Sequence, residues 1–108
     1  MTEICKNITP DTVDITILGH CDAGRINGMD LCCCAVSMLT YTLMEALGGM
    51  MLENFKSTYG GGWCHIRFGT KSKDKNKAMI AINTIMKGFS LLERAYPTSV
   101  NIVKEAKV

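Results

Sequence analysis

An apolar run over residues 31–52 is the feature that most limits how this chain can fold. The run carries one charge, Glu45, and is nearly long enough to span a bilayer, but it has no basic flank and is interrupted by Gly48 and Gly49. A helix that is apolar all round is usually enclosed by its own protein. We therefore predict a buried core helix over residues 31–47, capped by Asp30 and stopped by the two glycines, with no membrane association.

Composition limits the rest of the interpretation. The chain has 108 residues, 47% of them hydrophobic and 20% charged, which predicts one globular domain over residues 1–108. A formal net charge of +2 is too small for electrostatic capture of nucleic acid or anionic lipid. Six cysteines are too few for a small secreted disulfide scaffold, and the first residues lack the pattern of an export signal. We expect a cytoplasmic protein with free thiols.

Hydrophobic periodicity predicts the remaining elements. Short β-branched runs joined by a Pro-Asp turn indicate an antiparallel hairpin, and a polar loop with three glycines follows it. Apolar residues at three- and four-residue spacings indicate a second helix that Pro97 ends. The predicted strands cover residues 3–7, 12–18, 63–68 and 99–103, and residues 50–59 are predicted as a further strand, with an extension of the first helix as the alternative. The loop covers residues 19–29, a polar connector covers residues 71–77, and the stripe of the second helix consists of Ile82, Ile85, Met86, Phe89 and Leu92.

This order is β-β-α-β-β-α-β, and it predicts an α+β single domain with two helices packed on small antiparallel sheets. The lysine-rich connector is expected to be solvated, because an aspartate dilutes its charge and no aromatic residue is interleaved. Met50 and Met51 are expected to fill the core or, alternatively, to line an adaptable apolar groove.

Candidate chemistry gathers around the start of the first helix. A reactive cysteine needs a thiolate, which a helix N-terminus and a histidine partner both favour. The Asp30 carboxylate is positioned to accept from the amide of Cys32 or Cys33, in the first helical turn. His20 closes the second predicted strand, and the loop after it returns to the same edge of the domain. We expect the imidazole and one of the thiols to share a small volume, and the pKa of that thiol to lie below its usual value.

The three adjacent cysteines cannot share one role, because successive helical residues point about 100° apart. Ser37 lies four residues after Cys33, on the same helical face, where it either orients the site or bonds back to its own helix. Buried cysteines acting as small apolar side chains are the alternative interpretation of the whole cluster.

Several motifs together resemble the bacterial ribosomal-processing cysteine protease family, Prp. They are Gly19-His20, the run DLCCCAVS that starts at Asp30, a Gly-Gly pair before an aromatic strand, and LLERAYP at the end of the last helix. The family pattern is G-H-A, a short loop, D-[IV]-V-C-A-A-V-S, a G-G strand and a helix ending near Y-P. The order of elements agrees along nearly the whole chain.

The resemblance implies a nucleophile at Cys33, a base at His20, supporting roles for Asp30 and Ser37, and a mobile loop containing Gly24 and Gly28. This chain departs from the pattern at Cys21, Cys32 and Cys34, which leaves Cys32 as a competing nucleophile.

The resemblance also implies the substrate and the assembly: removal of the N-terminal extension of large-subunit ribosomal protein number twenty-seven, by a homodimer in the bacterial cytoplasm. Substrates of this family present bulky apolar residues before the scissile bond, typically two phenylalanines. A groove lined by the Met- and Leu-rich end of the first helix would suit such residues, and backbone amides at the helix start would hold the oxyanion.

Three alternatives compete with this assignment. A zinc site could use His20, Cys21, one of the three adjacent cysteines, and Cys64 or His65. However, no C-x-x-C pair is present, and neighbouring strand residues face opposite sides, so we expect no metal and no cofactor. The others are a catalytically degenerate relative kept as a binding module, and a phage-borne relative acting in capsid maturation.

Overall fold

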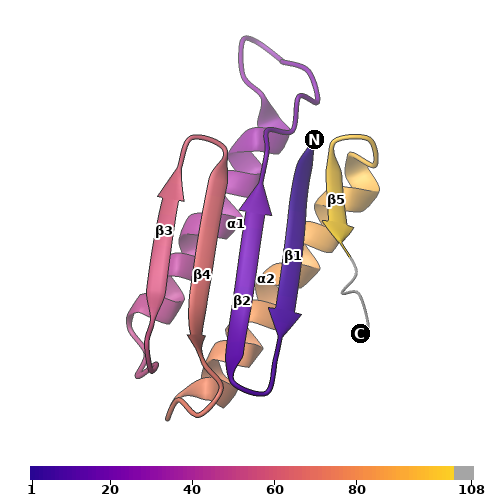
Figure 1. Ribbon diagram of the computed structural model, residues 1–108. Helices are drawn as coiled ribbons and strands as arrows, with labels where there is room; N and C mark the ends of the chain where they lie inside the picture. The colour runs from indigo at the N-terminus through magenta and orange to yellow at the C-terminus, as the bar shows by residue number, and fades with distance from the viewer. Residues whose placement is uncertain (104–108) are drawn as a thin grey trace.

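The computed structural model describes residues 1–103 and contains one five-stranded sheet with two helices on one face (Figure 1). In chain order the elements are β1 (Thr2–Ile8), β2 (Thr12–Leu18), α1 (Leu31–Gly48), β3 (Lys56–Gly60), β4 (Trp63–Gly69), α2 (Lys75–Ala95) and β5 (Val100–Val103). The predicted α+β class and the β-β-α-β-β-α-β order are confirmed. The last five residues of the predicted domain 1–108 lie outside the described residues.

The strands lie side by side in the order β3-β4-β2-β1-β5, and each helix joins two strands that point the same way. β4 and β1 both pair antiparallel with β2, and α2 returns the chain to the end of the sheet where β4 begins. β5 therefore runs parallel to β1, which makes the sheet mixed rather than antiparallel throughout.

The prediction that helix α1 is buried on all sides is partly wrong. By length and hydropathy it could cross a membrane, and we expected its own protein to enclose it. Instead one face packs on the sheet, while Leu31, Met38 and Tyr41 are exposed on the outside. The sheet can cover one side of a helix only, because the open side of a two-layer domain meets solvent. The residues buried on its inner face are Cys32, Val36, Thr40, Leu43 and Leu47.

The predicted strand over residues 50–59 is wrong in its first half. Strand β3 begins at Lys56, and residues 50–55 are irregular. Their backbone amides bond to the loop before α2: the Met51 amide donates to Asp74 Oδ2 at 2.8 Å, and the Glu53 amide donates to Ser72 Oγ at 2.7 Å. Amides that bond to side chains in this way do not pair in a sheet.

The predicted polar connector over residues 71–77 is wrong at its end, because α2 begins within it, at Lys75. Three of its four lysines are nevertheless solvated, as expected: Lys71, Lys73 and Lys77 are exposed, whereas Lys75 is half-buried.

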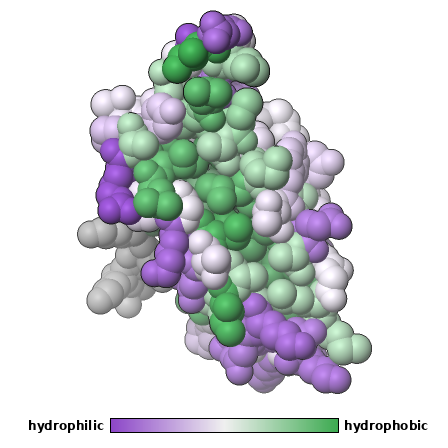
Figure 2. Space-filling model, turned by 180° about the vertical axis from the view of Figure 1, so that it is seen from behind, coloured by the Kyte–Doolittle hydropathy of each residue, from purple (hydrophilic) through white to green (hydrophobic). Residues whose placement is uncertain are grey.

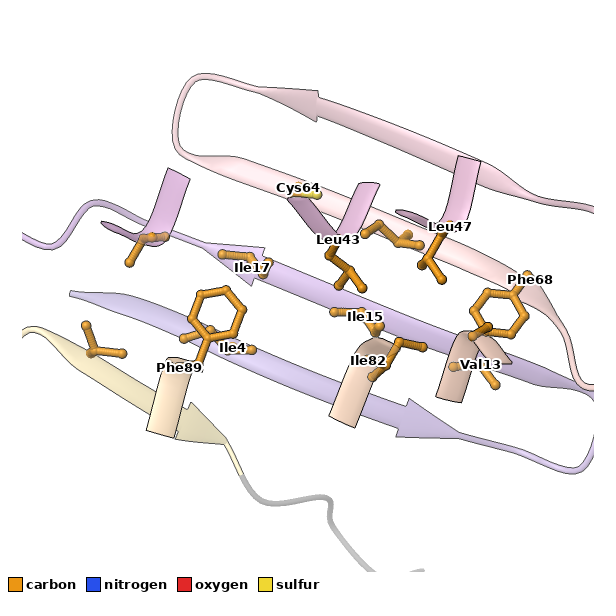
Figure 3. Close-up of a cluster of buried hydrophobic side chains, with 14 of the residues drawn as sticks. Ile4, Val13, Ile15, Ile17, Leu43, Leu47, Cys64, Phe68, Ile82 and Phe89 are labelled. Atoms are coloured by element: carbon orange, nitrogen blue, oxygen red, sulfur yellow. The ribbon is translucent and has the colours of Figure 1, made fainter. Parts of the chain in front are cut away.

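The core lies between the sheet and the helices (Figure 3). Alternate residues of the central strands point into it, and each fully buried Ile, Leu or Phe contributes about 1.5–3 kcal/mol. The predicted apolar stripe of α2 is confirmed, since Ile82 and Phe89 are fully buried and Ile85, Met86 and Leu92 pack beside them. Gly88 lets α1 approach α2, because a Cβ there would lie 2.8 Å from a methyl carbon of Leu39.

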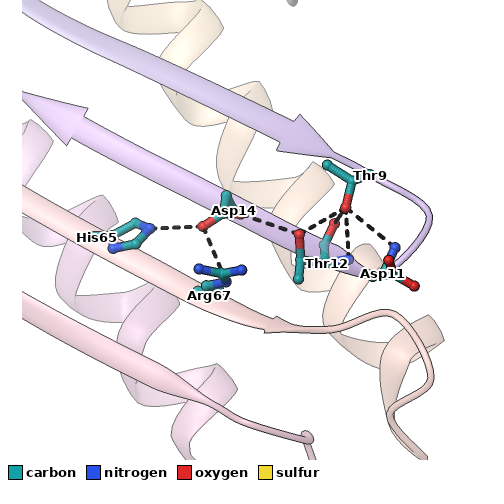
Figure 4. A network of polar contacts seen from close by, with 6 residues as sticks. All are labelled: Thr9, Asp11, Thr12, Asp14, His65 and Arg67. Carbon is teal, nitrogen blue, oxygen red and sulfur yellow. Dashed lines mark hydrogen bonds and ion pairs between the residues drawn. The ribbon is translucent and has the colours of Figure 1, made fainter.

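The other face of the sheet is polar (Figure 4). His65 Nε2 on β4 lies 2.8 Å from Asp14 Oδ1 on β2, and Arg67 Nε lies 4.0 Å from the same oxygen. His65 is half-buried, as predicted for a strand residue, and its neighbour Cys64 points to the opposite face and is buried. A partly exposed cluster of this kind contributes little to stability.

Candidate active site

A pocket of about 210 Å³ opens where β2 ends, α1 begins and the β3–β4 hairpin turns. Its lining includes three of the predicted site residues, His20, Cys33 and Ser37. They come from two segments, since His20 lies in the loop over residues 19–29, whereas Cys33 and Ser37 lie on α1. The fold therefore brings the imidazole and one of the three adjacent thiols to one cavity.

His20 lies two residues after the end of β2 and is exposed at the edge of the pocket. Two backbone contacts hold the preceding residue: the Gly19 amide donates to the Gly62 carbonyl at 2.7 Å, and the Thr2 hydroxyl donates to the Gly19 carbonyl at 3.2 Å. The imidazole packs against Gly62, where an added Cβ would lie 2.7 Å from Nε2. Gly62 also has a φ of +79°, a conformation that favours glycine. Our sequence interpretation used this glycine only as part of the Gly-Gly motif and assigned it no role in the site.

The start of α1 places each of the three adjacent cysteines differently. The cap is as predicted: the Cys33 amide donates to Asp30 Oδ1 at 3.0 Å. Cys33 is half-buried and lines the pocket, whereas Cys34 is exposed and Cys32 is 1% exposed in the core. The helical rotation of about 100° per residue separates them, so Cys33 is the member of this run that reaches the cavity.

The predicted low pKa of the site thiol is wrong. Burial raises the pKa of Cys33, and the neighbouring Cys21 and Asp30 raise it further, while Arg25 in the loop opposes them. The carboxylate that caps the helix therefore opposes the effect of the helix dipole on this thiol. The buried Cys32 has a pKa raised to about 12, mainly by burial and by its hydrogen bond with the Cys21 thiol.

Aromatic side chains form much of the remaining wall. Tyr41 of α1 and Tyr59 of β3 meet edge to face, with ring centroids 5.7 Å apart, and Trp63 follows at the start of β4. The expected Met- and Leu-rich groove is not part of this pocket, because its lining contains no methionine or leucine. Sequence reasoning missed the aromatic wall because its members lie on separate elements. The edge-to-face pair is a geometry that aromatic rings favour.

The loop between His20 and Asp30 extends beyond the end of the sheet (Figure 1). Gly24 and Gly28 have φ values of +93° and +79°, and both are exposed, with nothing within 4 Å of the position that a Cβ would take. The Arg25 guanidinium donates to the Gly28 carbonyl at 3.0 Å, and Ile26 and Met29 pair across the tip. The loop leaves the pocket lined mainly by helix and strand residues.

No group of three or more His, Cys, Asp or Glu side chains suited to a metal occurs within residues 1–103. Cys64 and His65 lie on opposite faces of β4, as expected for neighbouring strand residues.

The Cysteine protease Prp family model matches residues 1–101 of this chain. A search of curated proteins found no match. Among solved structures, the chain is similar to the essential ribosomal processing protease Prp from S. aureus in complex with a covalently linked product peptide, at 23% identity and a TM-score of 0.80, covering 97% of this chain and 100% of that one.

The S. aureus Prp complex with a substrate peptide is also similar, at 22% identity and a TM-score of 0.73, with 97% of this chain and 100% of that chain covered. SMU.848 from Streptococcus mutans is 19% identical, with a TM-score of 0.64 and coverage of 97% and 99%. At these identities the structures show a shared fold, and the family model covers nearly the whole sequence. The chain therefore belongs to the cysteine protease Prp family.

Proposed function

We propose that this protease removes the N-terminal extension of large-subunit ribosomal protein number twenty-seven, with Cys33 as nucleophile and His20 as general base. The observation that carries the proposal is that these two side chains line one pocket. The S. aureus protein that shares this fold is a ribosomal processing protease, and its structures hold a substrate peptide or a covalently linked product peptide. A peptide substrate also fits a pocket that is open at the surface and walled by aromatic rings.

In the proposed reaction, His20 takes the proton of the Cys33 thiol, and the thiolate attacks the carbonyl carbon of the scissile bond. His20 then protonates the leaving amine, and a thioester joins the enzyme to the acyl part of the substrate. A water molecule, deprotonated by His20, hydrolyses the thioester and frees the thiol.

Asp30 and Ser37 support this chemistry in different ways. Asp30 holds the first turn of α1 through two bonds, since its side chain accepts from the Cys33 amide and its carbonyl accepts from the Cys34 amide, both at 3.0 Å. These two amides are therefore occupied, and an oxyanion at the helix start would need other donors. Ser37 lines the pocket one helical turn beyond Cys33, where its hydroxyl can contact a bound peptide.

The aromatic wall supports the proposed preference for phenylalanine before the scissile bond. Tyr41, Tyr59 and Trp63 offer ring edges and faces to an incoming aromatic side chain. The mobile-loop proposal stands beside it: the exposed loop with Gly24 and Gly28 would order over the peptide and complete the site.

A peptide assay tests the assignment. We expect a peptide with an apolar residue followed by Gln-Phe-Phe-Ala to be cleaved, and replacement of either Phe by Ala to reduce kcat/KM by about 10- to 200-fold. Cleavage rates that do not change when either phenylalanine is replaced would contradict the ribosomal substrate, but they would not contradict the protease activity. No cleavage of any peptide by wild-type protein would favour the degenerate binding module.

We further propose a homodimer in the bacterial cytoplasm. The helix-covered side of the molecule carries a broad apolar surface (Figure 2). Exposed apolar side chains on α1 and α2 contribute to it, namely Leu31, Met38, Tyr41, Ile80 and Leu91. Light scattering should give about twice the chain mass of 11.8 kDa, whereas a monomer at all concentrations would contradict the dimer. All six cysteines are free thiols, which fits a reducing compartment.

A further inference from the structure

Three thiols from two chain segments meet beside the pocket. Cys21 follows His20, and its thiol hydrogen-bonds that of Cys32 in the first turn of α1. On its other side, Cys21 Sγ lies 3.3 Å from Thr2 Oγ1. Thr2 and Cys33 line the same pocket. The Cys21 thiol therefore lies between the helix start and Thr2 of the pocket wall, close enough to the proposed nucleophile to raise the pKa of Cys33.

The three thiols differ in how easily a small oxidant reaches them. Cys21 and Cys32 are 2% and 1% exposed, whereas Cys33 is half-buried and opens onto the cavity. A hydroperoxide that enters the pocket therefore meets Cys33 first.

Geometry also selects the partner that can react with an oxidised Cys33. Its helical neighbours Cys32 and Cys34 point about 100° away from it, which is unsuitable for a disulfide within a regular helix. Cys21 belongs to a different segment and is followed by an exposed loop, so it is the neighbouring thiol whose approach to Cys33 the regular helix does not prevent.

We propose that Cys21 is the resolving thiol of Cys33, so that hydroperoxides switch this protease off reversibly through a Cys21–Cys33 disulfide. The proposal rests on the proposed function in taking Cys33 as the nucleophile.

The chemistry balances in two steps. The Cys33 thiolate attacks the peroxide oxygen, the O–O bond breaks, and sulfenic acid forms while hydrogen peroxide is reduced to hydroxide, which is protonated to water. The Cys21 thiol then attacks the Cys33 sulfur, the S–O bond breaks, and hydroxide leaves as water with the Cys21 proton. A dithiol reductant then reduces the Cys21–Cys33 disulfide by thiol–disulfide exchange and restores both thiols. The disulfide thereby protects Cys33 from irreversible oxidation to the sulfinic acid.

Digestion with trypsin reveals the disulfide, because cleavage after Arg25 places Cys21 and Cys33 on different peptides. Cys21 falls in the peptide 7–25, while Cys32, Cys33 and Cys34 fall in the peptide 26–56. The full chain is reduced, desalted, treated with hydrogen peroxide, alkylated and digested. We expect the two peptides to appear as one species, lighter than their sum by two hydrogens, that dithiothreitol separates.

Matched variants identify the partners. The cross-link should persist in Cys32→Val and disappear in Cys33→Ser. Cys21→Ala should lose its peptidase activity to peroxide without recovery in dithiothreitol, and its Cys33 side chain should gain two oxygen atoms. Wild type and the control Cys5→Ala, whose thiol lies on the opposite face of the sheet, should recover most of their activity.

Three results would overturn the proposal: a cross-link that survives Cys33→Ser, oxidation of wild-type Cys33 without any cross-link, or full recovery of Cys21→Ala. The mass measurement needs no peptidase activity, so it separates failure of this proposal from failure of the proposed function. If Cys21→Ala fails to fold by circular dichroism, the wild-type cross-link and its response to Cys32→Val decide the question.

Discussion

The imidazole of His20 lies against Gly62, so that a Cβ at residue 62 would be 2.7 Å from its Nε2 atom. His20 lies just after the end of β2, and Gly62 lies just before the start of the neighbouring strand β4. Because the two strands are antiparallel, both residues are at the same edge of the sheet, where the Gly19 amide donates to the Gly62 carbonyl. The β3–β4 turn therefore sets the position of the proposed base.

Gly62→Ala should reduce kcat/KM by about a hundredfold, because the new methyl group displaces the His20 ring. The positive φ at this position should also cost about 1 kcal/mol of stability. Gly61→Ala is the matched control, since nothing lies within 4 Å of its Cβ position. Equal activity of the two variants, measured on the same peptide, would contradict this role of Gly62.

Cys33→Ala and His20→Ala should each reduce peptide cleavage by at least about a thousandfold while leaving the circular dichroism spectrum unchanged. Cys32→Ala should keep most of the activity but lose stability, because its side chain is in the core. The assignment of the nucleophile is wrong if Cys33→Ala is active and Cys32→Ala is folded but inactive.

Asp30→Asn should separate the two effects of the helix cap. Asparagine caps a helix as well as aspartate does, so the melting temperature should change little. Loss of the carboxylate should lower the pKa of Cys33 and increase its rate of alkylation by iodoacetamide near pH 7, followed by mass spectrometry. Asp30→Ala should show the same faster alkylation together with a loss of about 1 kcal/mol in stability. Unchanged alkylation in both variants would show that the carboxylate does not control this thiol.

The stability of the fold should decrease at alkaline pH through Cys32. Its pKa is about 12 in the folded protein against 9.0 normally, so below pH 9 the thiol is protonated in both states and contributes no pH dependence. As the pH rises from 9.0 toward 12, the unfolded chain loses this proton first, which favours unfolding.

Chemical denaturation across that range measures the effect. Because lysines and tyrosines also titrate there, Cys32→Val provides the comparison, and it should show a shallower decrease in the free energy of unfolding. Parallel curves for wild type and variant would contradict the assignment.

Local patterns in the sequence were sufficient for most of the elements. Alternation over β2 and the three- and four-residue spacing in α2 identify their core faces, because each periodicity places one set of side chains on one side. Asp30 marks the start of α1 for an equally local reason, since its carboxylate bonds an amide three residues later. The motif from Asp30 to Ser37 likewise located the candidate site.

Tertiary structure alone decided what depends on residues far apart in the chain. Residues 50–55 are irregular because amides of this segment donate hydrogen bonds to the side chains of Ser72 and Asp74. The parallel pairing of β5 with β1 depends on where α2 returns the chain to the sheet. Packing also places Cys33, and not Cys32, in the lining of the pocket, and burial there raises the pKa of Cys33. The contact between Tyr41 and Tyr59 likewise depends on how α1 packs beside β3. No local periodicity encodes such contacts, because they form only when separate helices and strands pack against each other.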